Sequence, residues 1–368
     1  MEKRKIMSLL CTLVLGTALI ATGCSKGSKE TSAEKDKDYT VNLGYYNCDH
    51  MTSACVAKDA GIFDKMGLKV NVSGNGKVPQ AMAAGKMDVG YIGYAGLIRG
   101  LAKGSPITVA ANNHLGGSMY LVASNKIKDS KDLIGKKLGI GTKPEEDERW
   151  LMCANKLGIP VEGKNYEGVE FGSDRDAYLA LKAGKIDGFL CCDPWGGSMA
   201  EYEKTGHIIA TADKIVGGDK WGGECCVYSM NTKFEKEHPE LAKKMIQAHV
   251  EAMKYCYEHP IKAAKIFAKN YQVPEEVAIM TIYKKTVGEG RTITWKMNDD
   301  YFKTEIDTLM KYKLIEEKPD YDKLISKKIY EEAKVDDFDK FIKENVDSIF
   351  PVGMKYEEWK VKAMEIDK

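Results

Sequence analysis

One stretch of sequence occurs twice in this chain, and the repetition constrains the fold more than any other feature does. Residues 81–95 read AMAAGKMDVGYIGYA, and residues 180–194 read ALKAGKIDGFLCCDP. Both copies predict a helix that ends at a glycine, a short turn, an aspartate, and an apolar strand that opens into a loop. Loops at the ends of such strands are where α/β sheets bind ligands. The second copy differs by placing a Cys-Cys pair, residues 191–192, where the first has Ile-Gly.

The order of the predicted elements indicates two α/β lobes. The series strand, helix, strand, helix, strand is predicted twice, and each series ends in one copy of the repeat. This alternation is expected of largely parallel sheets flanked by helices, and it indicates that one lobe is inserted into the other. A further strand is predicted at residues 106–111, followed by a polar loop at 112–118. From residue 227 onward the apolar residues recur mostly at helical spacing, as over residues 234–257.

Length and composition are those of a soluble globular protein. The 368 residues are 43% hydrophobic and 30% charged, and they suffice for two domains of ordinary size. Domains of this size build a large core and do not need disulfides for stability. The net charge of +1 gives no reason to expect a nucleic-acid partner.

The N-terminus resembles a bacterial lipoprotein signal peptide. A basic start precedes an apolar run over residues 6–20, and small residues then lead into Cys24. A run this short is not expected to persist as a membrane-spanning helix. We therefore expect cleavage after residues 1–23, lipidation of Cys24, and an extracytoplasmic protein anchored to the bacterial membrane through residues 24–38, a flexible tether. The alternative is an ordinary secretory signal that is cut nearby.

Several segments, in their order and spacing, resemble the solute-binding proteins of bacterial ABC importers. The resemblance is to the group that includes nitrate, sulfonate, taurine and thiamine-precursor binders, and it covers residues 39 to about 290. Besides the lipoprotein start, it rests on AGIF at residues 60–63, AGKMDV at 84–89, DLIGKKLG at 132–139, AGKID at 183–187 and FEKEHPE at 234–240.

This resemblance implies a two-lobe, periplasmic-binding-protein-like fold of type II with a helical C-terminal region. Each lobe would contain a mainly parallel sheet flanked by helices, and ligand would bind in a cleft that closes by a hinge. Lobe 1 would comprise residues 39–123 and 228–368, and lobe 2 residues 124–227, with hinge strands near 121–125 and 227–231. The resemblance also implies a monomer that delivers its ligand to an ABC permease and ATPase and has no catalytic residues.

Cysteines gather in the segments that would face this cleft. Five of them fall on three such segments, and thiolates, imidazole and carboxylates are the ligands that soft and borderline metals prefer. We therefore predict a thiophilic ligand, namely a metal ion, a metal complex or a metallocluster of iron-sulfur type. The predicted metal ligands are Cys48, His50, Cys191, Cys192, Cys225 and Cys226. The full set of predicted ligand-binding residues adds Asp49, Tyr94, His114, Glu145, Asp193 and Trp195.

Other roles stay open for these residues. One cysteine of each pair fits a strand core, and disulfides that shape an organic-ligand site are a further alternative. Cys153 and Cys256 lie on predicted helices and fit the core. Acidic residues at a helix start are ordinary there, although in the cleft they would repel a nitrate or sulfonate. Tyr94 and Trp195 would suit stacking on a thiamine-related pyrimidine, which keeps a small organic or sulfonate ligand as the alternative.

Two further classes of protein compete with an importer binding protein. The yeast thiamine-pyrimidine synthases resemble this fold and use a cysteine-rich segment with iron and a lysine-bound pyridoxal cofactor. The Cys191-Cys192 pair is a partial likeness to them, but a protein outside the cytosol has no evident supply of that cofactor. An extracellular sensor or adhesin would differ from the importer protein only in its partner. The sequence therefore favours a binding protein over an enzyme and names no cofactor.

Overall fold

The computed structural model describes residues 36–46, 48–74, 76–116, 119–211 and 224–368. The predicted signal peptide, the Cys24 lipidation site and most of the predicted tether lie outside these residues. Within the described part of the chain, no helix is long and apolar enough to cross a membrane.

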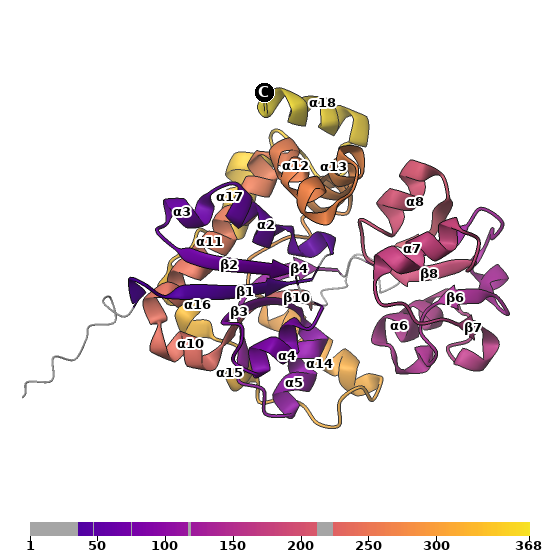
Figure 1. Cartoon of the computed structure of the whole chain (residues 1–368), viewed down its shortest axis with the longest axis horizontal. Helices are drawn as coiled ribbons and strands as arrows, with labels where there is room; N and C mark the ends of the chain where they lie inside the picture. Colours follow the sequence, from indigo (N-terminus) through magenta and orange to yellow (C-terminus); the bar gives the residue numbers. More distant parts are fainter. Residues whose placement is uncertain (1–35, 47, 75, 117–118, 212–223) are drawn as a thin grey trace, which may run out of the picture.

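Two sheets with the same topology frame the molecule (Figure 1), each of five strands within the described residues. The first has the order β2-β1-β3-β10-β4, with β1 Thr40–Tyr45, β2 Lys69–Gly74, β3 Val89–Gly93, β4 Ile107–Leu115 and β10 Glu224–Asn231. The second has the order β7-β6-β8-β5-β9, with β5 Tyr120–Ser124, β6 Lys137–Gly139, β7 Glu167–Gly168, β8 Gly188–Cys191 and β9 Gly206–Thr211. The predicted α/β fold is therefore confirmed.

One strand in each sheet runs against its neighbours. Strand β10 is antiparallel to β3 and β4, and β5 is antiparallel to β8 and β9, whereas the remaining pairings are parallel. Each reversed strand is the first one after the chain crosses from one sheet to the other. These two strands overlap the segments predicted as hinge strands. The division into lobes at residues 123 and 227 stays a prediction.

The repeated stretch occupies equivalent places in the two sheets. Helices α4 (Val78–Ala83) and α7 (Asp174–Lys182) lead into β3 and β8, which are each third in their sheet order. A carboxylate oxygen of Asp88 accepts a hydrogen bond from the backbone N–H of Asn42 on β1 at 2.8 Å. Asp187 accepts the corresponding bond from Lys137 on β6 at 3.2 Å. The repeated aspartate therefore fixes the register between the second and third strands in each sheet order.

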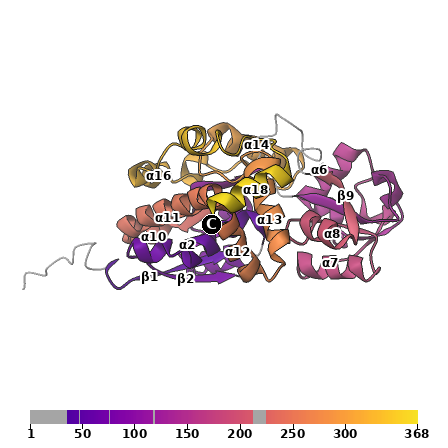
Figure 2. The same ribbon diagram turned by 90° about the horizontal axis from the view of Figure 1, so that it is seen from above.

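The helices cover both sheets and fill the C-terminal part of the chain (Figures 1 and 2). Those preceding β10 include α2 (Thr52–Asp59), α3 (Ile62–Lys65), α5 (Tyr94–Ala102), α6 (Glu148–Leu157) and α8 (Gly197–Glu203). Those following it are α10 (Thr232–Glu237), α11 (Pro239–Glu258), α12 (Pro260–Tyr271), α13 (Glu275–Tyr283), the π-helix η6 (Lys284–Gly288), α14 (Asp299–Lys311), α15 (Tyr321–Leu324), α16 (Lys327–Ala333), α17 (Phe338–Phe341), the π-helix η7 (Ile342–Val346) and α18 (Tyr356–Ile366).

The predicted polar loop at residues 112–118 is wrong over its first half. Strand β4 continues to Leu115, because its backbone has partners on both sides. Residues of β10 pair with it on one side, and His114 forms a bridge to Ile293 on the other. The error arises because distant segments, rather than local sequence, complete the backbone hydrogen bonds of β4.

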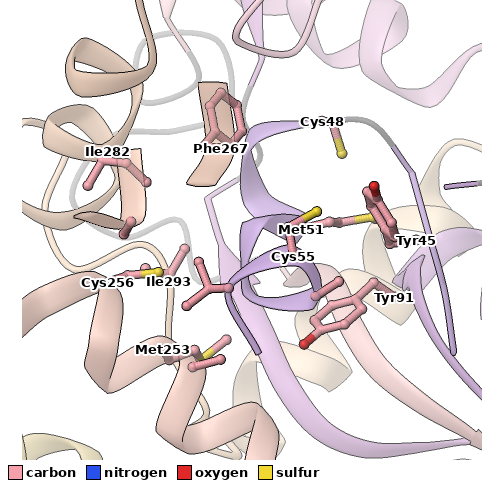
Figure 3. Close-up of a cluster of buried hydrophobic side chains, with 14 of the residues drawn as sticks. Tyr45, Cys48, Met51, Cys55, Tyr91, Met253, Cys256, Phe267, Ile282 and Ile293 are labelled. Carbon is pink, nitrogen blue, oxygen red and sulfur yellow. The ribbon is translucent and has the colours of Figure 1, made fainter. Parts of the chain in front are cut away.

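The core beside the first sheet explains the cysteines that lie on helices. Cys55 of α2 and Cys256 of α11 are buried in one apolar cluster together with Tyr91, Met253 and Phe267 (Figure 3). Cys153 of α6 is buried in the cluster beside the second sheet. The prediction of core positions for Cys153 and Cys256 is confirmed.

We expect Asp88→Ala to lower the free energy of unfolding by about 1.5–3 kcal/mol, the range for a hydrogen bond to a charged group. The substitution removes the acceptor of the Asn42 N–H and of the Tyr39 hydroxyl. Denaturant titration followed by circular dichroism measures the change. Asp38→Ala is the control, because Asp38 forms only an exposed ion pair with Lys69 and should leave the midpoint unchanged. Equal midpoints for Asp88→Ala and the parent protein would contradict this role for the repeated aspartate.

Candidate functional site

A cavity of about 870 Å³ opens where strand ends of the two sheets approach each other. Its lining includes residues at or just beyond the ends of β2, β3 and β8 and at the start of β10. Its volume lies in the range of sites that hold small molecules and cofactors. Six of the predicted ligand-binding residues line it: Cys48, His50, Cys192, Trp195, Cys225 and Cys226.

The loop after β1 presents the first cysteine and histidine. Cys48 precedes the short helix η1 (Asp49–Met51), and its Sγ lies 3.0 Å from Nε2 of His50. Two hydrogen bonds to backbone carbonyls hold this loop. The Tyr271 hydroxyl donates to the carbonyl of Cys48 at 3.0 Å, and the Asn113 amide donates to the carbonyl of His50 at 2.7 Å. The loop is therefore fixed by α12 and β4, which are both distant in sequence.

The Cys225-Cys226 pair lies at the irregular start of β10. Register shifts against β4 flank Cys226, and a bulge of this kind redirects side chains that would otherwise alternate between the two faces. The two sulfur atoms are 3.5 Å apart, and both residues line the cavity. The bulge thus presents the pair as a dithiol on one wall.

The Cys191-Cys192 pair divides between core and cavity. Cys191 is buried, its thiol lies 3.7 Å from the carbonyl oxygen of Tyr120, and it packs against Gly196, where an added Cβ would lie 2.5 Å from the sulfur. Cys192 is half-buried and lines the cavity, and its backbone N–H donates to a carboxylate oxygen of Asp174 at 3.1 Å. Cys192 is therefore the member of this pair that is available to a ligand in the cavity.

Burial keeps three of the cavity cysteines and His50 uncharged. It raises the pKa of the Cys48, Cys192 and Cys226 thiols well above the usual value. Burial, together with the positive charge of Lys285, lowers the pKa of His50 to about 3. At neutral pH these three thiols are therefore protonated and His50 is a neutral imidazole, which is the form that binds metals.

Asp49 and Asp193, which were predicted to bind ligand, anchor the cysteine-bearing loops. Neither aspartate is among the described residues that line the cavity. Asp49 lies 3.3 Å from Nζ of Lys285, and Asp193 lies 3.5 Å from Nζ of Lys284. The backbone N–H of Asp49 donates to the carbonyl of Asp193 at 2.9 Å, which joins the loop after β1 to the loop after β8. Asp193 also accepts two hydrogen bonds from Ser198 at the start of α8.

Three other predicted residues lie away from the cavity lining described above. Tyr94 is buried beside α14, and its hydroxyl donates to the carbonyl of Phe302 at 3.3 Å. Glu145 accepts a hydrogen bond from the backbone N–H of Gly163. His114 is fully buried behind His50, with their ring centroids 4.8 Å apart.

Charged residues that the sequence analysis did not single out also line the cavity. They include Arg99, Arg149, Arg175, Asp174 and Glu305. Arg149 pairs with Asp147 at 3.0 Å, and Arg175 lies over the Trp195 ring at 5.4 Å. The position of Arg99 could have been inferred, because α5 begins at Tyr94, at the end of the first copy of the repeat. Glu305 had no such signal, since α14 reaches the cavity only through tertiary packing.

The fold and the cavity define a two-sheet α/β protein with a cavity between strand ends. Residues 47–263 match the NMT1/THI5 like family, and the chain belongs to that family. The family resemblance inferred from the sequence is therefore confirmed.

The chain is also similar to curated relatives in sequence and to solved structures in fold. A Brucella abortus protein whose name describes a binding protein is 26% identical over 237 residues, which cover 63% of this chain and 72% of the relative. The ligand-binding component of an ABC-type import system from Staphylococcus aureus, solved with zinc bound, has a TM-score of 0.63 at 14% identity. The match covers 80% of this chain and 99% of the Staphylococcus aureus chain. The periplasmic nitrate-binding protein of Synechocystis PCC 6803 has a TM-score of 0.63 at 16% identity. The match covers 89% of this chain and 98% of the Synechocystis chain.

We expect Lys285→Met to lower the free energy of unfolding by about 3–5 kcal/mol, because it removes one partner of a buried ion pair and leaves the other charge without compensation. Burial alone would lower the pKa of Lys285, but Glu289 and Asp49 raise it above its usual value, so the side chain stays charged. Thermal and denaturant unfolding measure the effect. Lys327→Met removes an exposed ion pair and should change little. If both substitutions had the same small effect, the anchoring role of Lys285 would be refuted.

Proposed function

We propose that this protein is the extracytoplasmic solute-binding component of an ABC importer. The family match and the fold shared with such components support this role. A ligand-sized cavity between two sheets suits capture and release of a solute by hinge closure. The partners would be an ABC permease and ATPase, and genes encoding both beside this one would support the assignment. The lipoprotein-like N-terminus supports attachment to the outer face of the cell membrane through Cys24.

We further propose that the solute is a thiophilic metal ion, a metal complex or a metallocluster. One observation carries this proposal: four cysteines and a histidine from three separate segments line the same cavity. Core packing does not account for this convergence, because Cys192 and Cys225 are only half-buried. Thiol and imidazole donors favour soft and borderline metals over magnesium or calcium. The metal here is cargo to be delivered.

The charge of the cavity argues against a simple inorganic anion as the solute. Three arginines line it, but so do Glu146, Asp147, Glu148, Asp174, Glu224 and Glu305. Burial raises the pKa of Glu224 and Glu305 well above the usual value, so these two contribute little negative charge. The remaining acids still offset the arginines, one of which pairs with Asp147. The net field is therefore not the positive one that a nitrate or sulfonate requires.

A small organic ligand is the alternative solute. Tyr46, Trp195 and Tyr271 line the cavity and could stack on a flat heteroaromatic ring such as a thiamine-related pyrimidine. In that case the cysteines would serve as packing or as disulfides. The two solutes differ in a directly measurable property, since only the first brings metal with it.

We expect protein purified without oxygen from its own cells to carry a transition metal, with acid-labile sulfide if the cargo is an iron-sulfur cluster. Combined substitution of Cys48, Cys192, Cys225 and Cys226 by serine should reduce the bound metal to background. Thiolate ligands would then be absent, and a serine hydroxyl is a poor ligand for soft metals. Elemental and sulfide analysis provide the measurement.

The control is Cys153→Ala, which removes a thiol from the core beside the second sheet and should leave the metal content unchanged. Native mass spectrometry on the same sample reports the mass of any bound ligand. A colourless, metal-free protein that retains an organic ligand would contradict the metal proposal and favour the alternative.

A further inference from the structure

His114 occupies a position where a polar side chain is costly. It lies near the end of β4, has 0% exposure, and its backbone is paired with Cys226 on one side and Ile293 on the other. Strand pairing on both sides fixes the backbone here, so the side chain keeps its buried position. The imidazole must therefore find partners inside the protein or remain unsatisfied.

Among the described residues, neither ring nitrogen of His114 has a hydrogen-bond partner. His249 shows what a structural histidine looks like in the same protein, because it is equally buried and both of its nitrogens have partners. Its Nδ1 lies 2.9 Å from the Tyr91 hydroxyl, and its Nε2 lies 2.9 Å from the carbonyl oxygen of Asn112. Buried polar groups without partners are rare in native proteins and call for an explanation such as a missing ion.

Two further donor groups converge on His114. Ligand atoms of His50, His114 and Cys225 all lie within 4.8 Å of one another. Nδ1 of His50 is a second buried nitrogen without a hydrogen-bond partner among the described residues, and it lies 3.4 Å from a carboxylate oxygen of Asp49. Imidazole nitrogens on two adjacent rings, beside a cysteine that lines the cavity, are a donor set that suits a metal ion.

The surrounding residues hold these ligands in place. The Asn113 amide donates to the carbonyl of His50 at 2.7 Å, and Asn112 donates to a carboxylate oxygen of Glu224, the residue before Cys225. These hydrogen bonds fix the backbone at His50 and hold the residue next to Cys225. A second group, Asp49, His50 and Cys192, has comparable spacing. We favour the group with His114, because Asp49 is already engaged by Lys285.

We propose that His50, His114 and Cys225 form a mixed nitrogen-sulfur centre that anchors a transition-metal ion of the cargo at the inner wall of the cavity. This inference rests on the proposed metal-binding function and specifies which residues bind the metal ion directly. Three protein ligands leave a coordination position of a tetrahedral metal open. The cavity of about 870 Å³ is much larger than a bare ion needs, so we infer a cargo that brings its own ligands, either a metal chelate or a cluster.

Cobalt(II) is a suitable probe, because its bonds to thiolates give absorption bands that report the ligand set. Metal-free protein, prepared with a chelator under anaerobic conditions, is titrated with Co²⁺. We expect the parent protein to develop a sulfur-to-cobalt charge-transfer band. His114→Phe should weaken Co²⁺ binding at least about tenfold, the lower limit seen when even a supporting residue of a metal site is removed.

The same variant gives a second readout that a structural role would not produce. Because His114 has no hydrogen bonds to lose, metal-free His114→Phe should be as stable as the parent protein or more stable. The matched control is His249→Phe, which loses two hydrogen bonds and should lower the unfolding midpoint while leaving Co²⁺ affinity unchanged. His114→Leu repeats the test with a smaller side chain.

The outcomes separate this inference from the function on which it rests. Unchanged Co²⁺ affinity in His114→Phe, or failure of both His114 variants to fold, would overturn the mixed centre. If the four-cysteine variant alone then lost its metal, the metal-binding function would stand without this centre. If the parent protein bound neither Co²⁺ nor any metal from its own cells, both proposals would fail.

Discussion

The buried ion pairs of two adjacent lysines determine where the cysteine-bearing loops lie. Lys285 is 1% exposed, and Lys284 and Lys285 contact Asp193 and Asp49, each of which directly follows a cavity cysteine in sequence. A buried charge is tolerated only when it is paired, so these contacts constrain both loops strongly. The hydrogen bond from Asp49 to the carbonyl of Asp193 then joins the loops of the two sheets. Each aspartate therefore positions the cysteine before it, and the cavity depends on this arrangement.

The chemistry of the cavity follows from burial. Burial keeps the Cys48, Cys192 and Cys226 thiols protonated and keeps His50 and the adjacent His114 neutral. Neutral sulfur and nitrogen donors repel neither a cation nor a neutral complex, and they favour soft metals when the thiols release their protons on binding. The arginines and acidic residues on other parts of the wall provide polar contacts to the remainder of a larger cargo. This combination suits a metal complex better than a small oxyanion.

Much of the fold could be predicted from local sequence, but the site could be predicted only in part. The repeat predicted two equivalent strand ends, since glycine, aspartate and an apolar run are local signals. It also directed attention to Cys192, which lines the cavity. Sequence could not distinguish Cys192 from its neighbour Cys191, because the direction of each side chain depends on packing against Gly196 and Tyr120. The extension of β4 to Leu115 and the lysines of η6 depend on contacts between distant segments, which local patterns do not report.

X-ray absorption spectroscopy at the edge of the bound metal, on protein purified anaerobically from its own cells, tests the central claim most directly. If the cavity holds a thiophilic metal cargo through its cysteines, the first coordination shell should contain sulfur at about 2.3 Å from the metal. If the mixed centre is correct, it should also contain nitrogen at about 2.0–2.1 Å; both distances are typical of zinc. A first shell of oxygen alone, or protein that contains no metal while its cavity holds an organic ligand, would contradict it.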